Sequence, residues 1–258
     1  MAVGAFSVPA TALALRPHGA RRHTTAVTVL PTSSAASGTA RIGALYPGAG
    51  TTTHTCTASV VSSPHGNLLI TAAHCVSGDG RGMVFAPGQH GNQAPYGRWT
   101  VTGAYVAPTW IAGQNPDDDV AFLTVAPQTV GGKLTEIQRV TGAYRLGPSV
   151  KRGERVTVMG YPSGTVNNPI SCTVRIYMTA EFPTFDCHGY VDGTSGSPWV
   201  HETAHGPEVV GVIGGRNQGG CLEYTSYSSP LRRAVTTYGR ALAGAPADTA
   251  PAPRSDGC

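Results

Sequence analysis

Apolar residues in this chain are gathered into short runs that are separated by glycine, proline and polar residues. In the first half the runs cover residues 56–62, 67–71, 82–85, 99–106 and 120–125. The fourth run is rich in aromatic and β-branched residues, and the fifth is continuously apolar, as is typical of β-strands. The pattern therefore predicts a strand-rich unit over residues 42–130.

A second series of short apolar runs follows a longer connection at residues 131–150. These runs cover residues 155–159, 171–178, 187–191, 198–200, 209–213 and 224–226, within a second unit at 151–230. Only residues 231–242 have helical spacing, with a proline at the start and one apolar face made of Leu231, Val235, Tyr238 and Leu242. Many short strands and one terminal helix predict an all-β fold.

Both ends of the chain differ from the middle in composition. Residues 1–14 are small and apolar and end in Ala-Leu-Ala, which predicts a signal-peptide remnant or, alternatively, an Ala-rich disordered end. Residues 15–41 lack periodicity and predict a pro-segment or linker, and the Ala/Pro-rich residues 243–258 predict a mobile tail. No run reaches the roughly 20 apolar residues of a membrane span, so we expect a secreted protein without a membrane partner.

Composition narrows the function classes. The 258 residues include 34 glycines and 20 prolines, which suits many turns, and the net charge is only +4. Basic residues are scattered rather than clustered, which argues against a nucleic-acid partner. Six cysteines predict disulfides if the protein is exported.

Three short motifs carry candidate chemistry. In chain order they read Thr-Ala-Ala-His-Cys at 71–75, Asp-Val-Ala-Phe-Leu at 119–123 and Gly-Thr-Ser-Gly-Ser-Pro at 193–198. They supply a base (His74), an orienting acid (Asp119) and a nucleophile (Ser195). Acyl transfer near neutral pH needs such a set, because a serine hydroxyl becomes nucleophilic only beside a base with a fixed tautomer.

The order His, Asp, Ser resembles that of the trypsin/chymotrypsin-fold serine peptidases, in particular their secreted bacterial-type branch. The stretch Cys-Thr-Ala-Ser-Val-Val at 56–61 is similar to the family strand Cys-Gly-Gly-Ser-Leu-Ile, and the resemblance covers residues 42–242. It implies two antiparallel β-barrels with a C-terminal helix. His74 and Asp119 would come from the first barrel and Ser195 from the second.

The resemblance also implies an activity. It is that of a monomeric serine endopeptidase without cofactor or metal, which acts on protein or peptide substrates through an acyl-enzyme on Ser195. The N–H groups of Gly193 and Ser195 would bind the oxyanion. Of three adjacent aspartates, Asp119 matches the family because it directly precedes Val-Ala-Phe-Leu, whereas Asp117 and Asp118 are assigned to a solvated turn.

Substrate specificity follows from two family positions. The residue at the base of the primary pocket lies six before the nucleophile and is Gly189, so the position offers no acid for arginine or lysine. The family wall segment Ser-Trp-Gly corresponds to Gly214, Gly215 and Arg216, which implies a more open pocket. Arg216 either attracts an acidic substrate residue or faces water.

Zymogen activation in this family involves a cleavage site and an aspartate, and only the cleavage site has a counterpart here. Arg41-Ile42 resembles the cleavage site of a zymogen, in which the new N-terminus pairs with an aspartate before the nucleophile. Here Thr194 occupies that position and carries no charge, so the pairing would need a substitute such as Asp192.

Cysteine pairing is partly indicated by the resemblance. The family strand supports Cys56–Cys75, and Cys172–Cys187 would bracket the hairpin before the nucleophile. Cys221–Cys258 is then left by elimination, while Cys187–Cys221 is a competing arrangement.

A rival motif is His-Glu-Thr-Ala-His at residues 201–205, which matches the zinc-peptidase pattern. Its chemistry needs a helix, so that His201 and His205 bind the metal on one face and Glu202 activates water. A short strand before it and Gly-Pro after it favour a hairpin tip. The alternatives to a serine endopeptidase are therefore a zinc metallopeptidase and a secreted binding protein on an inactive peptidase scaffold.

Overall fold

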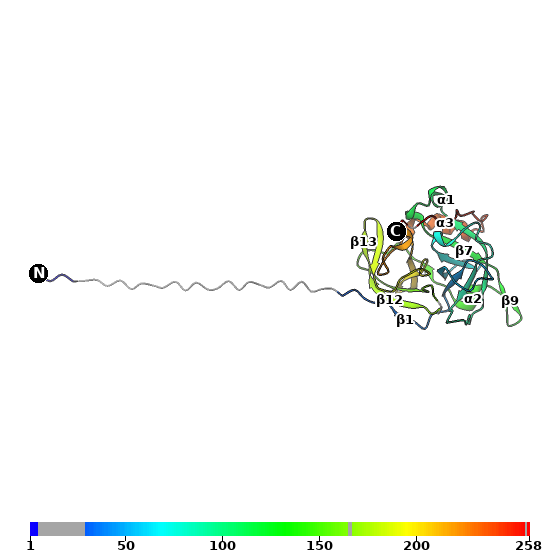
Figure 1. Cartoon of the computed structure of the whole chain (residues 1–258), viewed down its shortest axis with the longest axis horizontal. Coiled ribbons are helices and arrows are strands. Elements are labelled where there is room, and N and C mark those ends of the chain that lie inside the picture. Colours follow the sequence, from blue (N-terminus) through cyan, green and yellow to red (C-terminus); the bar gives the residue numbers. More distant parts are fainter. Residues whose placement is uncertain (5–28, 165–166, 256) are drawn as a thin grey trace.

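Six antiparallel strands of the first half close into a barrel (Figure 1). Around the barrel they are β2 (Ile42–Tyr46), β3 (Cys56–Val61), β4 (Leu68–Thr71), β7 (Ala121–Val125), β6 (Trp99–Val106) and β5 (Val84–Pro87). The computed structural model describes residues 1–4, 29–164, 167–255 and 257–258. Five predicted strands of this half correspond to β3–β7, with shifts of one or two residues at most ends.

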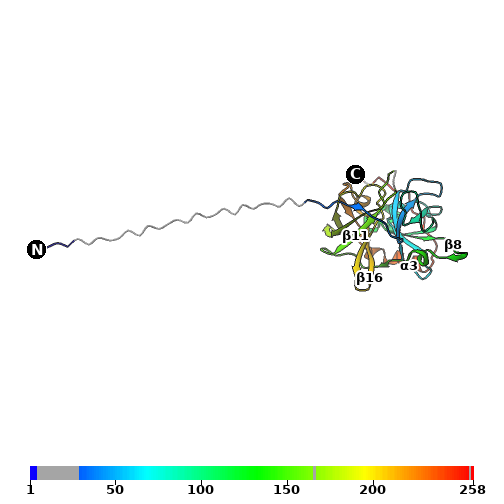
Figure 2. The ribbon, with the colours of Figure 1, turned by 90° about the horizontal axis from the view of Figure 1, so that it is seen from below.

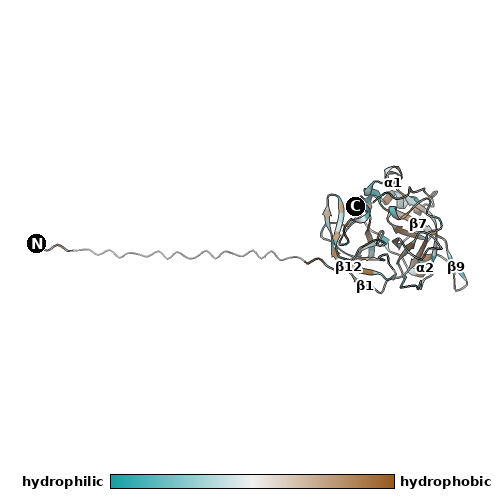
Figure 3. Ribbon diagram, in the orientation of Figure 1, coloured by the Kyte–Doolittle hydropathy of each residue, from teal (hydrophilic) through white to brown (hydrophobic). Residues whose placement is uncertain are grey.

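Most positions on both faces of the barrel strands are buried, and in β4 all four residues are. In β4, Leu69 packs inside the barrel with Leu45, Phe85 and Trp99. Its neighbours Leu68 and Ile70 join a second apolar cluster on the opposite face. Alternate side chains of a strand point to opposite faces, so one strand contributes side chains to both apolar clusters. Figure 3 shows the hydrophobic colouring of these strands.

The second half contains two further sheets (Figure 2). The larger has the order β1 (Ser34–Ala35), β12 (Ile170–Arg175), β11 (Arg155–Gly160), β15 (Pro198–Thr203), β16 (Gly206–Val212) and β10 (Arg145–Leu146). The smaller contains β13 (Tyr177–Thr179), β14 (Phe182–Asp186) and β17 (Thr225–Tyr227). The two sheets share one core, in which the rings of Phe185 and Trp199 lie 5.1 Å apart edge to face. The all-β architecture predicted from the sequence is confirmed.

Short helices and one hairpin complete the fold. They are α1 (Pro108–Gly113), α2 (Ile137–Thr141), α3 (Val235–Leu242), the 3₁₀ turns η1 (Ala73–Cys75), η2 (Pro116–Asp118), η3 (Arg216–Gly219) and η4 (Leu231–Arg233), and the β8 (Gln128–Val130)–β9 (Lys133–Thr135) hairpin. The predicted helix 231–242 is therefore divided into η4 and α3. A 3₁₀ turn has about three residues per turn, which changes the helical phase. Val235, predicted to be inward, is 60% exposed, and Thr237 and Ala241 are buried instead.

Two strand predictions of the second half need correction. The run 171–178 is divided into β12 and β13, and the predicted strand 187–191 is not a strand. The strand lies earlier, in β14, which pairs with both β13 and β17. β14 was not predicted because it contains Pro183, and proline within a run argues against a strand.

Segments predicted to lie outside the fold are partly built into it. Within the predicted linker 15–41, Thr32 bridges His188 and β1 pairs with β12, so this part of the linker belongs to the second half. Within the predicted mobile tail, Ala250 is buried and bridges Gly78. The signal-peptide prediction concerns residues 1–14, of which 5–14 lie outside the described residues. None of the described helices is long and apolar enough to cross a membrane.

Candidate active site

His74 is carried by a tight turn between two fixed points. It follows β4 and lies in η1, where Ala72 and Ala73 are fully buried and let the chain pack closely. The disulfide Cys56–Cys75 joins this turn to β3. The turn therefore holds the imidazole at the edge of the first barrel, with its side chain only 8% exposed.

Asp119 is fully buried between η2 and β7 and faces His74. Its Oδ2 lies 2.7 Å from His74 Nδ1, and its Oδ1 accepts the His74 backbone N–H at 2.9 Å. The Gly215 N–H donates to the same Oδ2 at 2.8 Å. The carboxylate accepts from all these partners, so the His74 ring carries its proton on Nδ1 and leaves Nε2 able to accept one.

Ser195 lies in a turn that approaches the first barrel closely. Gly196 has φ +79°, and a Cβ there would lie 2.2 Å from Thr71 Oγ1 and 2.3 Å from the Thr57 carbonyl. Only glycine fits such a conformation and such a space. The Ser195 carbonyl accepts the Thr57 N–H at 2.7 Å, which links the nucleophile segment of the second half to β3.

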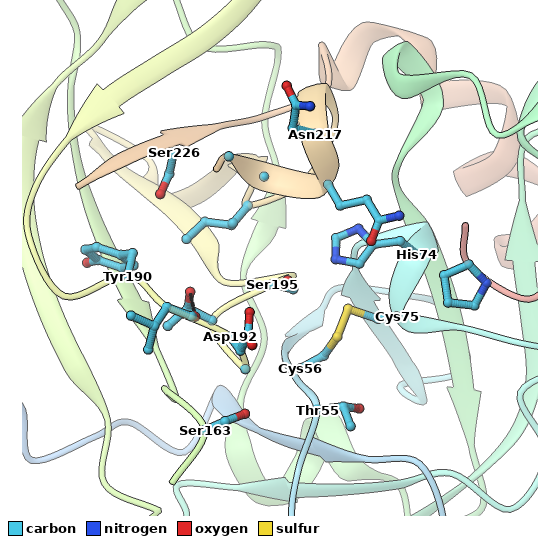
Figure 4. A pocket seen from close by; sticks show the side chains of 18 of the residues that line it. Thr55, Cys56, His74, Cys75, Ser163, Tyr190, Asp192, Ser195, Asn217 and Ser226 are labelled. Atoms are coloured by element: carbon cyan, nitrogen blue, oxygen red, sulfur yellow. Dashed lines mark hydrogen bonds between the residues drawn. A yellow bond between two sulfur atoms is a disulfide. The ribbon is translucent and has the colours of Figure 1, made fainter. Parts of the chain in front are cut away.

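His74 and Ser195 line one cavity of about 950 Å³. Figure 4 shows the two side chains next to each other, on the wall that also carries the Cys56–Cys75 disulfide. Within the described residues their side chains make no direct hydrogen bond, a common condition when no substrate is bound. The structure thus brings together all three predicted catalytic residues: Asp119 contacts His74, and His74 shares the cavity with Ser195.

Two backbone N–H groups at the nucleophile are oriented by their surroundings. The Asp192 carbonyl accepts the Ser163 N–H at 2.6 Å, and because a trans peptide points its C=O and N–H in opposite directions, the Gly193 N–H is directed away from Ser163. The Gly193 carbonyl is held by the Thr57 hydroxyl at 3.0 Å. Neither Gly193 nor Ser195 donates its N–H to any other group in the part of the chain that the structure describes. The sequence analysis assigned no role to Thr57, although it lies in the family-like stretch 56–61, or to Ser163, which lies in no motif.

Asp118 differs from the solvated turn residue that the sequence predicts. It is buried, and Arg233 donates two hydrogen bonds to it at 2.8 and 2.7 Å, with a third from Thr109 at 2.6 Å. Burial raises the pKa of Asp118, but the hydrogen bonds from Arg233 and Thr109 and the charge of Arg233 outweigh it, so the pKa is lowered. Asp118 thus fastens the turn before Asp119 to η4, while Asp117 is half-buried.

The four residues predicted to set substrate specificity lie outside the described lining of the catalytic cavity. Gly189, Gly214, Gly215 and Arg216 are not among the described residues that line the cavity. A Cβ at Gly214 would lie 3.1 Å from Asp119 Oδ2, so this glycine packs behind the acid rather than in the cavity. Arg216 is exposed, and its guanidinium lies 5.8 Å from the Tyr227 ring centre.

The cavity also contains an acid that sequence reasoning missed. Glu223 lines it and accepts the Gly189 N–H at 2.7 Å, and it also pairs with His188. These hydrogen bonds, from Gly189 first and then His188, lower the pKa of Glu223. Gly189, the residue assigned to the pocket base, has no acidic side chain, but its backbone N–H binds the carboxylate of Glu223. The two residues are 34 positions apart, so local sequence patterns do not indicate this contact.

Arg41-Ile42 is part of the barrel. Ile42 begins β2, is buried and pairs with Ser59, and the guanidinium of Arg41 lies 5.2 Å from the Tyr144 ring centre. The Thr194 hydroxyl donates to the Val191 carbonyl at 2.6 Å, so its hydrogen-bonding capacity is used locally.

The rival zinc motif lies on a β-hairpin. His201 is in β15 opposite Glu208, and Thr203 pairs with Gly206 where the hairpin turns. His201 Nδ1 lies 2.9 Å from the Arg155 carbonyl. Because the motif is not helical, His201, Glu202 and His205 are not placed as a zinc peptidase needs them. Among the described residues, the group with metal-ligand proximity is Cys56, His74 and Cys75, but its two sulfurs are bonded to each other.

The remaining cysteines form the disulfides Cys172–Cys187 and Cys221–Cys258. These are the pairings that the sequence analysis favoured, and the competing Cys187–Cys221 pair is not formed. Cys172–Cys187 joins β12 to the loop that leads to Ser195. Cys221–Cys258 joins the last residue to the cavity wall.

Comparison with known proteins defines the class. The family model of the trypsin-like peptidase domain matches residues 56–212, and the chain belongs to this family, that is, to the serine endopeptidases. No curated protein sequence matches the chain.

Several solved structures share the fold of this chain. The protease Anisep from Arthrobacter nicotinovorans is 22% identical with a TM-score of 0.67 and covers 82% of this chain and 100% of its own. A thermostable serine protease, AL20, from an extremophilic microorganism is 21% identical with a TM-score of 0.65, and the match covers 80% of this chain and 98% of that one. Human heparin binding protein is 14% identical with a TM-score of 0.64, and the match covers 86% of this chain and 100% of that one. The chymotrypsin-like fold class expected from the sequence is therefore confirmed.

Proposed function

We propose that this chain hydrolyses peptide bonds through an acyl-enzyme on Ser195. Ser195 Oγ attacks the carbonyl carbon while its proton passes to His74 Nε2, and the same proton then leaves on the amine as the C–N bond breaks. Water repeats the two steps and releases the acid and the free serine. Asp119 holds the imidazole and stabilises its protonated form. The observation that carries the proposal is the buried carboxylate bonded to a histidine that shares a cavity with this serine.

The N–H groups of Gly193 and Ser195 are proposed as the oxyanion donors. Fixed donors that have no other partner are most effective where negative charge develops, and each is worth about 3–4 kcal/mol of barrier. Human heparin binding protein carries the same fold under a name that describes binding. Fold alone thus does not decide activity, and the residues of the site must.

The proposed partner is a protein or peptide substrate, and the proposed mechanism needs neither metal nor organic cofactor. The three disulfides support work in an oxidising, extracellular compartment. We propose that the secreted protein acts as a monomer.

Labelling with a biotinylated phosphonate that reacts with active serines tests the proposal. We expect one adduct, and mass spectrometry of the digest should place it on Ser195. Heat-denatured protein is the control, because only the folded site activates the hydroxyl. A chelator should not reduce labelling. Folded protein that stays unlabelled would favour the binding-protein alternative.

Gly193→Ala should lower kcat by about 10²–10³-fold with a smaller effect on KM. Gly193 has φ +88°, and an added Cβ would lie 2.5 Å from Ser163 Oγ and 2.7 Å from the Tyr161 carbonyl, so the 192–193 peptide must move and its N–H with it. Gly206→Ala is the matched control, since Gly206 has φ +100° with open space around it. Equal kinetic losses in both variants would show backbone strain rather than loss of a donor.

A further inference from the structure

Residues 251–255, here called the C-terminal strap, are held by their backbone. Gln114 Nε2 donates to the Ala252 carbonyl at 2.8 Å, and Gln114 Oε1 accepts the Arg254 N–H at 2.9 Å. Gln218 Nε2 donates to the Arg254 carbonyl at 2.6 Å. In these three contacts the glutamine side chains bind only backbone groups of the strap, as a protein does when it binds an extended peptide of any sequence.

The two glutamines come from opposite halves of the molecule. Gln114 follows α1 in the first half, in the segment that leads to Asp119, and Gln218 lies in η3 of the second half. The Arg254 guanidinium also donates to the Gly113 carbonyl at 3.4 Å. Figure 1 shows the C-terminus on the same side of the molecule as α1. The strap therefore crosses the junction between the halves, where the catalytic residues also meet.

Strap residues line the catalytic cavity and the space next to it. Pro253 shares the cavity with His74 and Ser195. Arg254 and Ser255 line a second cavity of about 190 Å³, whose wall includes Gly215. Gly215 donates to the Asp119 carboxylate, so this second cavity adjoins the acid from outside. An extended substrate that reaches Ser195 across this wall would meet the strap.

The strap is fastened at both ends and is held between them by polar contacts. Before it, the Ala250 N–H and C=O both bond Gly78, at 2.7 and 2.9 Å. After it, Cys258 is bonded to Cys221 and lines the catalytic cavity. Between these points, residues 252–255 are exposed, so polar contacts rather than apolar burial keep them in place. Such a segment opens at low cost once one end is released.

We propose that the C-terminal strap is an autoinhibitory segment that occupies the groove for extended polypeptides. It takes the side-chain amides of Gln114 and Gln218 that an extended substrate backbone would otherwise take. Short substrates reach Ser195 beside it, whereas long ones must displace it. This inference rests on the proposed peptidase activity.

The test compares the full chain with a variant lacking residues 251–258 and carrying Cys221→Ser. Substrates are the ester of one blocked amino acid and peptides lengthened by one residue at a time on each side of the cleaved bond. For long peptides KM should fall about tenfold in the variant, because apparent affinity scales with the fraction of molecules whose groove is free, and a free fraction of about one in ten would give this change. For the ester, kcat/KM should change less than about twofold.

A second variant keeps the disulfide and the whole chain. Arg254→Pro removes the N–H that donates to Gln114 Oε1 and leaves both glutamines able to bind substrate, so it should lower KM for long peptides in the same direction but less. Arg254→Ala is the control, since it keeps that backbone N–H. A higher KM for long peptides after strap removal would overturn the inference and make the strap a binding wall. Equal losses on ester and peptides together with a lower melting temperature would also overturn it. No phosphonate labelling of Ser195 in any variant would instead contradict the peptidase proposal.

Discussion

Replacing Ser195 with alanine is expected to lower kcat/KM for peptide hydrolysis by about 10³-fold or more. The change removes the hydroxyl oxygen that would form the acyl-enzyme. It leaves the Ser195 carbonyl bonded to Thr57 and both proposed oxyanion donors in place. Substrate binding and stability should therefore change little, and the loss should fall on kcat.

Ser62→Ala is the matched control for this variant. The Ser62 hydroxyl makes no hydrogen bond within the described residues, and Ser62 is not part of the cavity wall. Initial rates, circular dichroism and thermal melting of both variants give the answer. If the Ser195→Ala variant folds and cleaves peptides at an undiminished rate, Ser195 is not the nucleophile.

Asp119→Asn is expected to lower kcat by about 10⁴-fold near neutral pH. Three N–H groups point at this carboxylate: the backbone N–H and Nδ1–H of His74, and the Gly215 N–H. An asparagine must turn its own NH₂ toward one of these donors. If it faces the ring, His74 shifts its proton to Nε2 and can no longer accept one from Ser195.

Asp117→Asn provides the comparison for Asp119→Asn. It makes the same substitution two residues earlier, where the side chain is half-buried and does not contact His74. Its rates should stay within about twofold of the unchanged protein, as surface substitutions usually cost little. A rate loss under about tenfold in the folded Asp119→Asn variant would remove Asp119 from the mechanism.

Much of the fold was predictable because its signals are local. Strand β6 was predicted with its observed bounds, Trp99–Val106, since β-branched and aromatic residues in a run favour a pleated surface. The motifs around His74, Asp119 and Ser195 were recognisable because their residue types and their chain order resemble those of a known peptidase family. The favoured disulfides are all present.

What the sequence determined by itself is the strand pattern, the fold class and the residues able to carry acyl transfer. The tertiary structure alone decided how distant segments use one another. It buried Asp118 against Arg233, placed Glu223 at Gly189, and laid the C-terminal strap against Gln114. Partners 34 to 140 residues apart leave no mark on local periodicity, because a hydrogen bond depends on atoms that meet only after the chain has folded.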